Sequence, residues 1–322
     1  MKTRFSIWIY LFIFFQAAFV EKMTGQFTIS DTTLANRLLP DALDFYEVNQ
    51  YDTAWTMMAQ ILDIYGSTVG LEFSQPCEAL RIQGIIKFET GYFAEAIPLL
   101  HTCLQHATKV FGETGRWVAN PNAYLGVCYP QLGEFDKGLF YLHRALDIRL
   151  NHLGKYHYRV SENYNNIGTT LWFRGNFREA QEYFLHAIEV DEGREEPQQQ
   201  DSVAWSLHCL NAGIAYKTLG EIKKGIQFFQ KSFGLLPDED WPELYYQKAS
   251  TLAEIANSYY TLGDYPNAIS LYEQTLDLLQ KSGNAEHPDV GLYFNNLSAA
   301  WSALGVETKE QYYIQAALAH WE

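Results

Sequence analysis

Histidines are the first residues in this sequence whose spacing could suggest a metal site. His101 and His106 are five residues apart, and so are His152 and His157. Because a helix turns once every 3.6 residues, a spacing of five directs two rings to different faces. A zinc ion needs ligands that converge on one point. We therefore predict structural roles for these histidines and no metal site in the chain.

A second candidate is the acidic run DEGREE at residues 191–196, because carboxylates are the ligands that calcium prefers. Its acids are Asp191, Glu192, Glu195 and Glu196. Charge runs of this kind are usually solvated, and the stretch continues as the polar sequence PQQQDS. We predict a surface loop over residues 191–202, with Asp201 or Ser202 capping the helix that follows.

Four cysteines could supply a nucleophile or a disulfide. None belongs to a CxxC pair, and they are Cys77, Cys103, Cys128 and Cys209. His208 precedes Cys209, but Cys209 occupies an apolar position of a helical pattern, so we do not predict a thiol nucleophile. All four are expected to be small buried side chains, and a Cys103–Cys128 bridge between neighbouring helices remains an alternative.

No catalytic motif stands out elsewhere. The sequence contains no glycine-rich phosphate loop, no HExxH and no GxSxG, so we predict neither an enzyme nor a cofactor. Its 322 residues are 48% hydrophobic, which is enough apolar material for a continuous core. Lys and Arg number 23 against 38 Asp and Glu, a net charge of −15. An acidic chain repels phosphate backbones, which argues against a nucleic-acid partner.

The N-terminus has the pattern of a targeting segment. Lys2 and Arg4 precede an uncharged, mostly apolar stretch over residues 5–20, which is short for a membrane span and typical of a signal peptide. We predict a signal peptide over residues 1–25, cleaved near Ala18 or before Gln26, and export to a periplasmic or extracellular space. The alternative is an uncleaved anchor formed by residues 5–20, with no other membrane contact.

After a short leader over residues 26–34, the chain repeats itself. Units begin near residues 35, 77, 119, 161, 206, 249 and 291, with spacings of about 42 residues, and fill the chain to residue 322. Unit position 8 is always small: Ala42, Gly84, Gly126, Gly168, Gly213, Ala256 and Ser298. Position 24 is always large and apolar: Met58, Leu100, Leu142, Phe184, Phe229, Tyr272 and Ile314.

The repeat predicts two amphipathic helices per unit, called A and B below. Apolar positions 4, 7, 8 and 11 share one helical face, as do 20, 24, 27 and 28. Position 15 is glycine in six units, where helix A must end and the chain must turn. Small residues at positions 8 and 20 should let helices A and B approach closely, with the large residue at 24 beside them. Neighbouring units must stack to bury both faces.

This pattern resembles the tetratricopeptide repeat family. The unit with Tyr164, Ile167, Gly168, Leu171 and Ala180 follows its signature, and Phe184 and Ala187 complete it. The 42-residue period is similar to the kinesin-light-chain-like subtype. The resemblance implies an all-α, right-handed α-solenoid of about seven helix-turn-helix units over residues 35–322.

Several prolines depart from the pattern. Pro40 falls inside helix A of the first unit, so that helix is expected to be short or to begin there. Pro130 should shorten helix A of the third unit. Pro98 and Pro266 fall near the first turn of helix B, where proline is tolerated.

The resemblance also implies a binding surface, because A helices line the concave groove of such solenoids. The implied groove residues are Arg81, Asn165, Asn166, Trp172, Phe173, Asn211, Lys217, Asn257, Tyr260 and Asn296. Asparagine can donate to and accept from an extended peptide backbone. An equal alternative is that the asparagines bond neighbouring turns. For Trp172 and Tyr260 groove exposure is favoured, since aromatic rings supply contact area.

Together these features predict a non-catalytic scaffold that binds a protein or peptide in the groove. A family member's clamp for a terminal carboxylate is not expected, because Arg81 stands alone among basic residues at the relevant positions. The alternative is a sensor half of a longer effector, such as a caspase-like CHAT protease or a signalling kinase. Apolar residues of the last unit, including Tyr312 and Leu318, would then contact a downstream domain, or a second copy in a homodimer.

Overall fold

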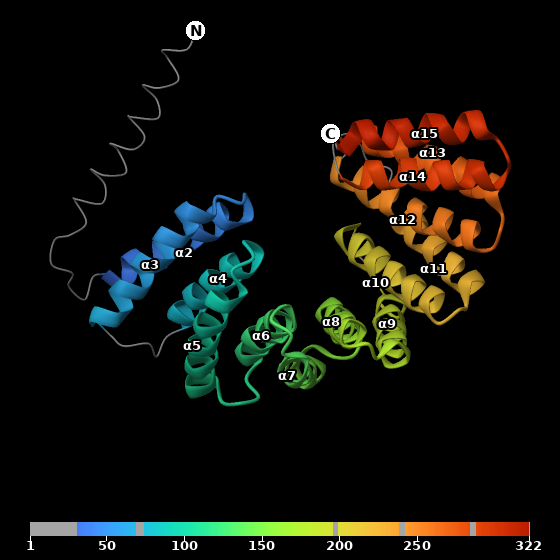
Figure 1. Ribbon diagram of the computed structural model, residues 1–322. Coiled ribbons are helices and arrows are strands. Elements are labelled where there is room, and N and C mark those ends of the chain that lie inside the picture. The colour runs from blue at the N-terminus through green and yellow to red at the C-terminus, as the bar shows by residue number, and fades with distance from the viewer. Residues whose placement is uncertain (1–30, 69–73, 196–198, 238–241, 284–287, 322) are drawn as a thin grey trace, which may run out of the picture. The chain divides into compact units, whose positions relative to one another are not determined.

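The computed structural model describes residues 31–68, 74–195, 199–237, 242–283 and 288–321 (Figure 1). The predicted signal peptide lies outside these ranges. Within them every regular element is a helix, and no helix is long and apolar enough to cross a membrane. The chain divides into two compact units, one up to Glu113 and one from Thr114.

Each unit is built of helix pairs. The first holds α2 (Asp31–Glu47) with α3 (Tyr51–Thr68), and α4 (Ser74–Glu89) with α5 (Phe93–Phe111). The second opens with the short 3₁₀ helix η1 (Arg116–Val118), followed by α6 (Ala119–Gln131) with α7 (Phe135–Leu153), α8 (Tyr158–Arg174) with α9 (Phe177–Glu192), α10 (Gln199–Thr218) with α11 (Ile222–Leu235), α12 (Pro242–Thr261) with α13 (Tyr265–Lys281), and α14 (Pro288–Ala303) with α15 (Glu307–Trp321). The described residues therefore contain seven A–B pairs, as the repeat predicts.

The contact between positions 8 and 24 holds each pair together. A Cβ atom built on Gly168 of α8 would lie 2.6 Å from a ring carbon of Phe184 on α9. Gly213 meets Phe229 at 2.5 Å in the same way. Real Cβ atoms do not come this close, so only glycine lets these helices approach so far. The predicted small-against-large seam is confirmed here.

The turn between helices A and B is confirmed as well. Gly175 follows α8 with φ at +94°, a left-handed conformation that a residue with a Cβ rarely adopts. The first helix pair, α2 with α3, has asparagine at this position, and Asn49 takes φ of +59°. Asparagine is the residue that best tolerates this region after glycine. The other glycines in this place with positive φ are Gly91, Gly133, Gly220, Gly263 and Gly305.

Two predictions from proline are wrong. Helix α2 runs through Pro40 from Asp31 to Glu47, and Pro40 is exposed, so its ring lies on the side of α2 away from the core. Pro130 does not shorten α6 at its end, because α6 stops at Gln131, at the same unit position where α4 stops. The Pro130 ring instead packs beside Gly138 of α7, in the space that this glycine leaves. Tertiary packing overrides the local cost of proline at both places.

Two smaller expectations also need correction. Pro98 is the sixth residue of α5 and lies on its exposed side, whereas Pro266 is in the first turn of α13 as predicted. Asp201 and Ser202 do not cap α10, because that helix already begins at Gln199.

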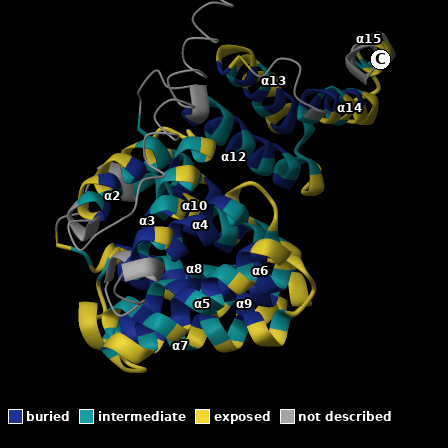
Figure 2. Cartoon of the chain, turned by 90° about the vertical axis from the view of Figure 1, so that its left-hand side faces the viewer, coloured by how far each residue is buried: buried dark blue, intermediate teal, exposed yellow. Residues whose placement is uncertain are grey.

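Neighbouring pairs stack by packing helix B of one pair against helix A of the next. This joins α3 to α4 in the first unit, and α7 to α8, α9 to α10, α11 to α12 and α13 to α14 in the second. Successive A helices also touch, as α6 and α8 do. Buried residues follow the inner faces of the helices, and exposed residues gather at helix ends and turns (Figure 2). Each pair thus depends on its neighbours to cover its outer faces.

Replacing Gly168 with leucine tests the seam. The new side chain would enter the space held by the Phe184 ring, and overpacking of this kind costs about 1–3 kcal/mol or more. We expect a lower melting temperature by circular dichroism. The matched control is Gly234→Ala in α11, where an added Cβ meets nothing within 4 Å and a helical alanine gains about 0.5–1 kcal/mol. Equal melting of Gly168→Leu and the parent chain would contradict the assigned contact.

Candidate functional site

The predicted groove asparagines of the second unit form two hydrogen-bonded pairs, each joining successive A helices. Asn211 of α10 donates from its side-chain amide to the side-chain oxygen of Asn165 on α8, at 2.8 Å. Asn296 of α14 donates likewise to Asn257 of α12, at 3.2 Å. The Tyr272 hydroxyl of α13 donates to the same Asn257 oxygen at 2.6 Å. The asparagines therefore bond one another between neighbouring units.

Each pair keeps groups that can serve a ligand. Among the described residues, the amide nitrogen of Asn165 and the amide oxygen of Asn211 hold no other hydrogen bond. The same is true of the Asn257 nitrogen and the Asn296 oxygen. Each pair thus keeps one donor and one acceptor, which is what one residue of an extended peptide backbone requires, and the donor of Asn165 belongs to a side chain that is only 7% exposed. Asn166, beside Asn165, is half-buried, and its backbone oxygen accepts from Thr170.

The aromatic candidates pack within their own helix pairs. The Trp172 ring lies 4.7 Å from the Phe177 ring at the start of α9, and Tyr260 lies 5.4 Å from Tyr265 at the start of α13. Both candidates are half-buried, while Phe173 is 65% exposed. The two helix pairs of the first compact unit show the same arrangement, in the ring pairs Tyr46–Tyr51 and Phe88–Phe93. These aromatics brace the A–B turn, and the five-residue spacing across the turn was a signal for this in the sequence.

The two basic candidates are both ion-paired. Lys217 of α10 bonds Glu254 of α12, and its ammonium also lies 6.0 Å from the centre of the Phe229 ring. Arg81 bonds Glu78 one helical turn earlier in α4. Arg81 belongs to the first compact unit, so it is described apart from the others. Lys217 instead ties the α10 and α12 surfaces together beside the asparagine pairs.

The sequence analysis missed a buried polar cluster at the helix ends beside this surface. The Arg149 guanidinium of α7 is 6% exposed and donates to the Arg159 carbonyl at 2.9 Å and the Asn163 side chain at 3.1 Å. Burial lowers the pKa of Arg149 to about 10. Arg159 donates to Asn120 of α6 at 2.8 Å. These bonds join α6, α7 and α8 through side chains that composition alone would place on the surface.

The interpretation of Asp191 as a loop residue is wrong. Helix α9 extends to Glu192, and Asp191 is buried against His208 of α10, with 2.6 Å between its oxygen and the His208 ring nitrogen. Both side chains are 3% exposed. Glu192 pairs with Lys231 of α11, and Glu195 is exposed. The sequence pattern of the acidic run did not indicate that Asp191 is buried, because its histidine partner lies 17 residues further along the chain.

Glu162 of α8 faces the same cluster. Its carboxylate is attracted by Arg149 and Arg159 and by His208, and repelled by Asp191. Burial outweighs the attraction and raises the pKa of Glu162 above its usual value. Burial therefore disfavours the charged form of Glu162 within this cluster.

His157 and the four cysteines have structural roles. His157 caps α8, because its ring nitrogen accepts from the Arg159 backbone N–H at 3.1 Å. The four cysteines are buried as free thiols, as predicted, and burial raises the pKa of Cys77 to about 11 and of Cys128 and Cys209 to about 12. Within the described residues no three metal-ligating side chains lie together.

These helix pairs are similar to those of known repeat proteins in sequence and in fold. The sequence profile of the tetratricopeptide repeat matches residues 117–193 and 247–321. Kinesin light chain-related protein 1 of Arabidopsis thaliana is 22% identical over 239 residues, 74% of this chain. The chain spans only 38% of the length of that protein.

Two solved structures have the same fold. The nearly identical TPR-like repeats of a Podospora anserina putative kinesin light chain have a TM-score of 0.53 and 16% identity, covering 65% of this chain and 99% of their own. The apo form of RapI has a TM-score of 0.71 and 11% identity, covering 89% and 76%. The fold therefore defines an all-α solenoid of helical hairpins. Residues 117–193 and 247–321 are tetratricopeptide repeats, and the chain as a whole is similar to kinesin-light-chain-like repeat proteins.

The raised pKa of Glu162 predicts how stability depends on pH. An acid whose folded pKa is raised stabilises the fold below its unfolded pKa, and this contribution is lost as pH rises through the folded pKa. Glu162→Gln removes the titration, so its free energy of unfolding should rise relative to the parent as pH increases from about 4, where a free glutamate titrates, toward neutral pH. Each tenfold change in proton affinity corresponds to about 1.4 kcal/mol.

Urea unfolding of both chains across this pH range measures the difference directly. Glu195→Gln is the matched control, because Glu195 is exposed, and its difference from the parent should stay flat. A free energy of unfolding for Glu162→Gln that stays constant relative to the parent, or that falls relative to it as pH rises, would contradict burial of this carboxylate.

Proposed function

We propose that the A-helix surface of residues 114–322 binds an extended segment of a partner polypeptide. The observation that carries this proposal is the pair of asparagine contacts, Asn165 with Asn211 and Asn257 with Asn296, which leave one donor and one acceptor each. Tetratricopeptide repeats support protein interaction in general, and the chain has no catalytic motif. The proposed role is that of a binding scaffold.

The hydrogen bond within each asparagine pair orients the side-chain amides before a peptide binds. A free asparagine on a helix surface must lose rotational freedom before it can hold a ligand. Here one hydrogen bond already fixes each side chain, so a peptide meets amides with a set orientation. Nearby charges are paired with each other, since Lys217 holds Glu254. This favours recognition of the peptide backbone over recognition of a charged side chain.

Exposed Phe173 supplies a place for an apolar side chain of the same segment. It is 65% exposed and follows Trp172, whose ring is fixed against Phe177. A large exposed ring beside a braced one offers contact area at little cost in order. The proposed ligand is therefore an extended, largely uncharged segment with an apolar residue near Phe173.

The double variant Asn165→Ala with Asn211→Ala tests the proposal. Removing both members leaves neither amide unpaired, so the fold should lose little. Loss of two ligand hydrogen bonds should cost about 1–3 kcal/mol, or roughly 5- to 150-fold in Kd. The partner is first identified by a photo-reactive residue placed at Asn166, and its binding segment is then titrated by calorimetry.

The control removes an equivalent polar pair away from this surface. Ser206 of α10 and Ser232 of α11 share a buried hydrogen bond of 2.9 Å, so Ser206→Ala with Ser232→Ala deletes an inter-helix bond without touching the asparagines. It should bind as the parent does. Equal affinity of the asparagine variant and the serine variant would show that the ligand does not use this surface.

A further inference from the structure

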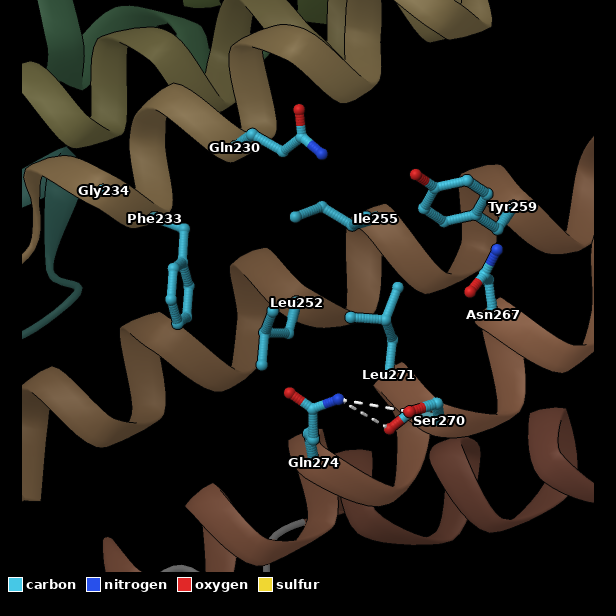
Figure 3. A pocket seen from close by; sticks show the side chains of 10 residues that line it. All are labelled: Gln230, Phe233, Gly234, Leu252, Ile255, Tyr259, Asn267, Ser270, Leu271 and Gln274. Carbon is cyan, nitrogen blue, oxygen red and sulfur yellow. Dashed lines mark hydrogen bonds between the residues drawn. The ribbon is translucent and has the colours of Figure 1, made fainter.

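A cavity lies on another face of the second unit, among helices α11, α12 and α13. Its volume is about 430 Å³, within the range of pockets that bind ligands (Figure 3). Its apolar wall consists of Phe233 from α11, Leu252 and Ile255 from α12, and Leu271 from α13. It is thus formed where two successive B helices lie over one A helix.

The rim of the cavity is polar but uncharged. Gln230 of α11, Tyr259 of α12, and Asn267 and Gln274 of α13 surround the apolar wall (Figure 3). Gln274 bonds Ser270 at 3.1 and 3.3 Å, and Asn267 bonds Asp264 at 2.7 Å. The side chains of Gln230 and Tyr259 have no hydrogen bond to any described residue. Both could bond an occupant.

The repeat provides its own control, because the same groove occurs between other pairs. Between α7 and α9, the rings of Tyr164 and Tyr183 lie 6.2 Å apart, and His143 lies 6.0 Å from Tyr183. Between α9 and α11, Tyr216 and Phe228 stack at 5.2 Å. Each of these grooves is occupied by rings that the chain itself supplies.

The last groove follows the same rule. Between α13 and α15, Phe294 stacks with Tyr313 at 6.2 Å. Position 23 of helix B carries the ring in all three cases: Tyr183, Phe228 and Tyr313. In the cavity this position is Leu271 and position 4 is Leu252, while Tyr259 keeps the ring at position 11 that Tyr216 provides in the α9–α11 groove. The cavity therefore lies where the chain elsewhere places an aromatic pair.

A glycine opens the same place further. Gly234 of α11 lines the cavity, and a Cβ built on it would meet nothing within 4 Å. Gly234 stands at position 29 of its unit, and this position is an acid in three other helix pairs of the second compact unit: Asp147, Glu189 and Asp277. Glycine within a helix costs about 0.5–1 kcal/mol relative to alanine, and no close contact at Gly234 requires it. Glycine in place of an acid therefore leaves the rim both less bulky and uncharged at this position.

We propose that this cavity receives an aromatic side chain from a partner polypeptide, in an uncharged stretch of that partner. The ring missing at position 23 indicates an aromatic side chain, and the uncharged rim indicates uncharged surroundings in the partner. Amides of Gln230 and Asn267 then bond the backbone on either side of the inserted residue. This surface is separate from the asparagine pairs, so the chain holds two partner segments at two places.

The test uses short neutral peptides with the full chain. The probes are acetyl-Gly-Tyr-Gly-amide, its alanine counterpart acetyl-Gly-Ala-Gly-amide, and free p-cresol, the side chain of tyrosine alone. Binding is followed by NMR through the methyl groups of Ile255, Leu252 and Leu271. We expect the tyrosine peptide to shift these methyls with a millimolar Kd, about tenfold or more below that of the alanine peptide.

Three variants locate the binding. Gly234→Phe and Leu271→Phe each supply the missing ring from the chain and should weaken the tyrosine peptide about tenfold or more. Gly234→Ala changes the same residue but leaves the cavity open, so its affinity should match the parent. Two different ring-bearing variants guard against one of them failing to fold, which circular dichroism reports.

Several outcomes would overturn the proposal. One is the absence of methyl shifts in the parent up to the solubility limit of the tyrosine peptide. A second is equal binding by the parent and both phenylalanine variants, which would put the peptide elsewhere. A third is p-cresol binding as tightly as the tyrosine peptide, which would make the cavity a site for a free aromatic molecule and not for a polypeptide.

Discussion

Close approach of helices A and B within each pair is the constraint on which the rest of the structure depends. At Gly168 and Gly213 the space that a Cβ would need is already filled by the ring of the partner helix. A methyl group at either glycine would push the helices apart or displace the ring. Because every pair must present the same two faces to its neighbours, a change of spacing in one pair would be felt in the next. The glycine therefore fixes the geometry of the stack as well as that of one hairpin.

Between pairs the structure uses polar side chains more than the sequence indicates. The asparagine pairs, the Lys217–Glu254 ion pair and the Asp191–His208 contact each join helices from different pairs. Apolar stacking gives little preference among rotations of one pair on the next, whereas a hydrogen bond is satisfied in one geometry only. Since some of these bonds lie on the A-helix surface, the groups that align the stack are also those that a ligand would meet.

The fold was predictable from the sequence because its causes are local and repeated. Glycine recurs at the position of Gly175 and a large apolar residue at the position of Phe184, so each copy tests the others. The candidate site was predictable only in part. Asn165 and Asn211 were identified as candidates, but their pairing joins residues 46 apart and depends on how two units stack. Pro40 and Asp191 were misjudged because packing, which the sequence does not show, decided their surroundings.

Because of the buried contact between Asp191 and His208, the alignment of α9 with α10 does not depend on the segment that connects them. This contact sets the register of α9 against α10 from within the core, where both side chains are 3% exposed. The connecting segment then has only to span the distance, and its sequence is polar and rich in glutamine. Foreign sequence introduced after Glu195 should thus leave the stack in place. This makes the junction a natural position for a reporter or an affinity tag between two halves of a working array.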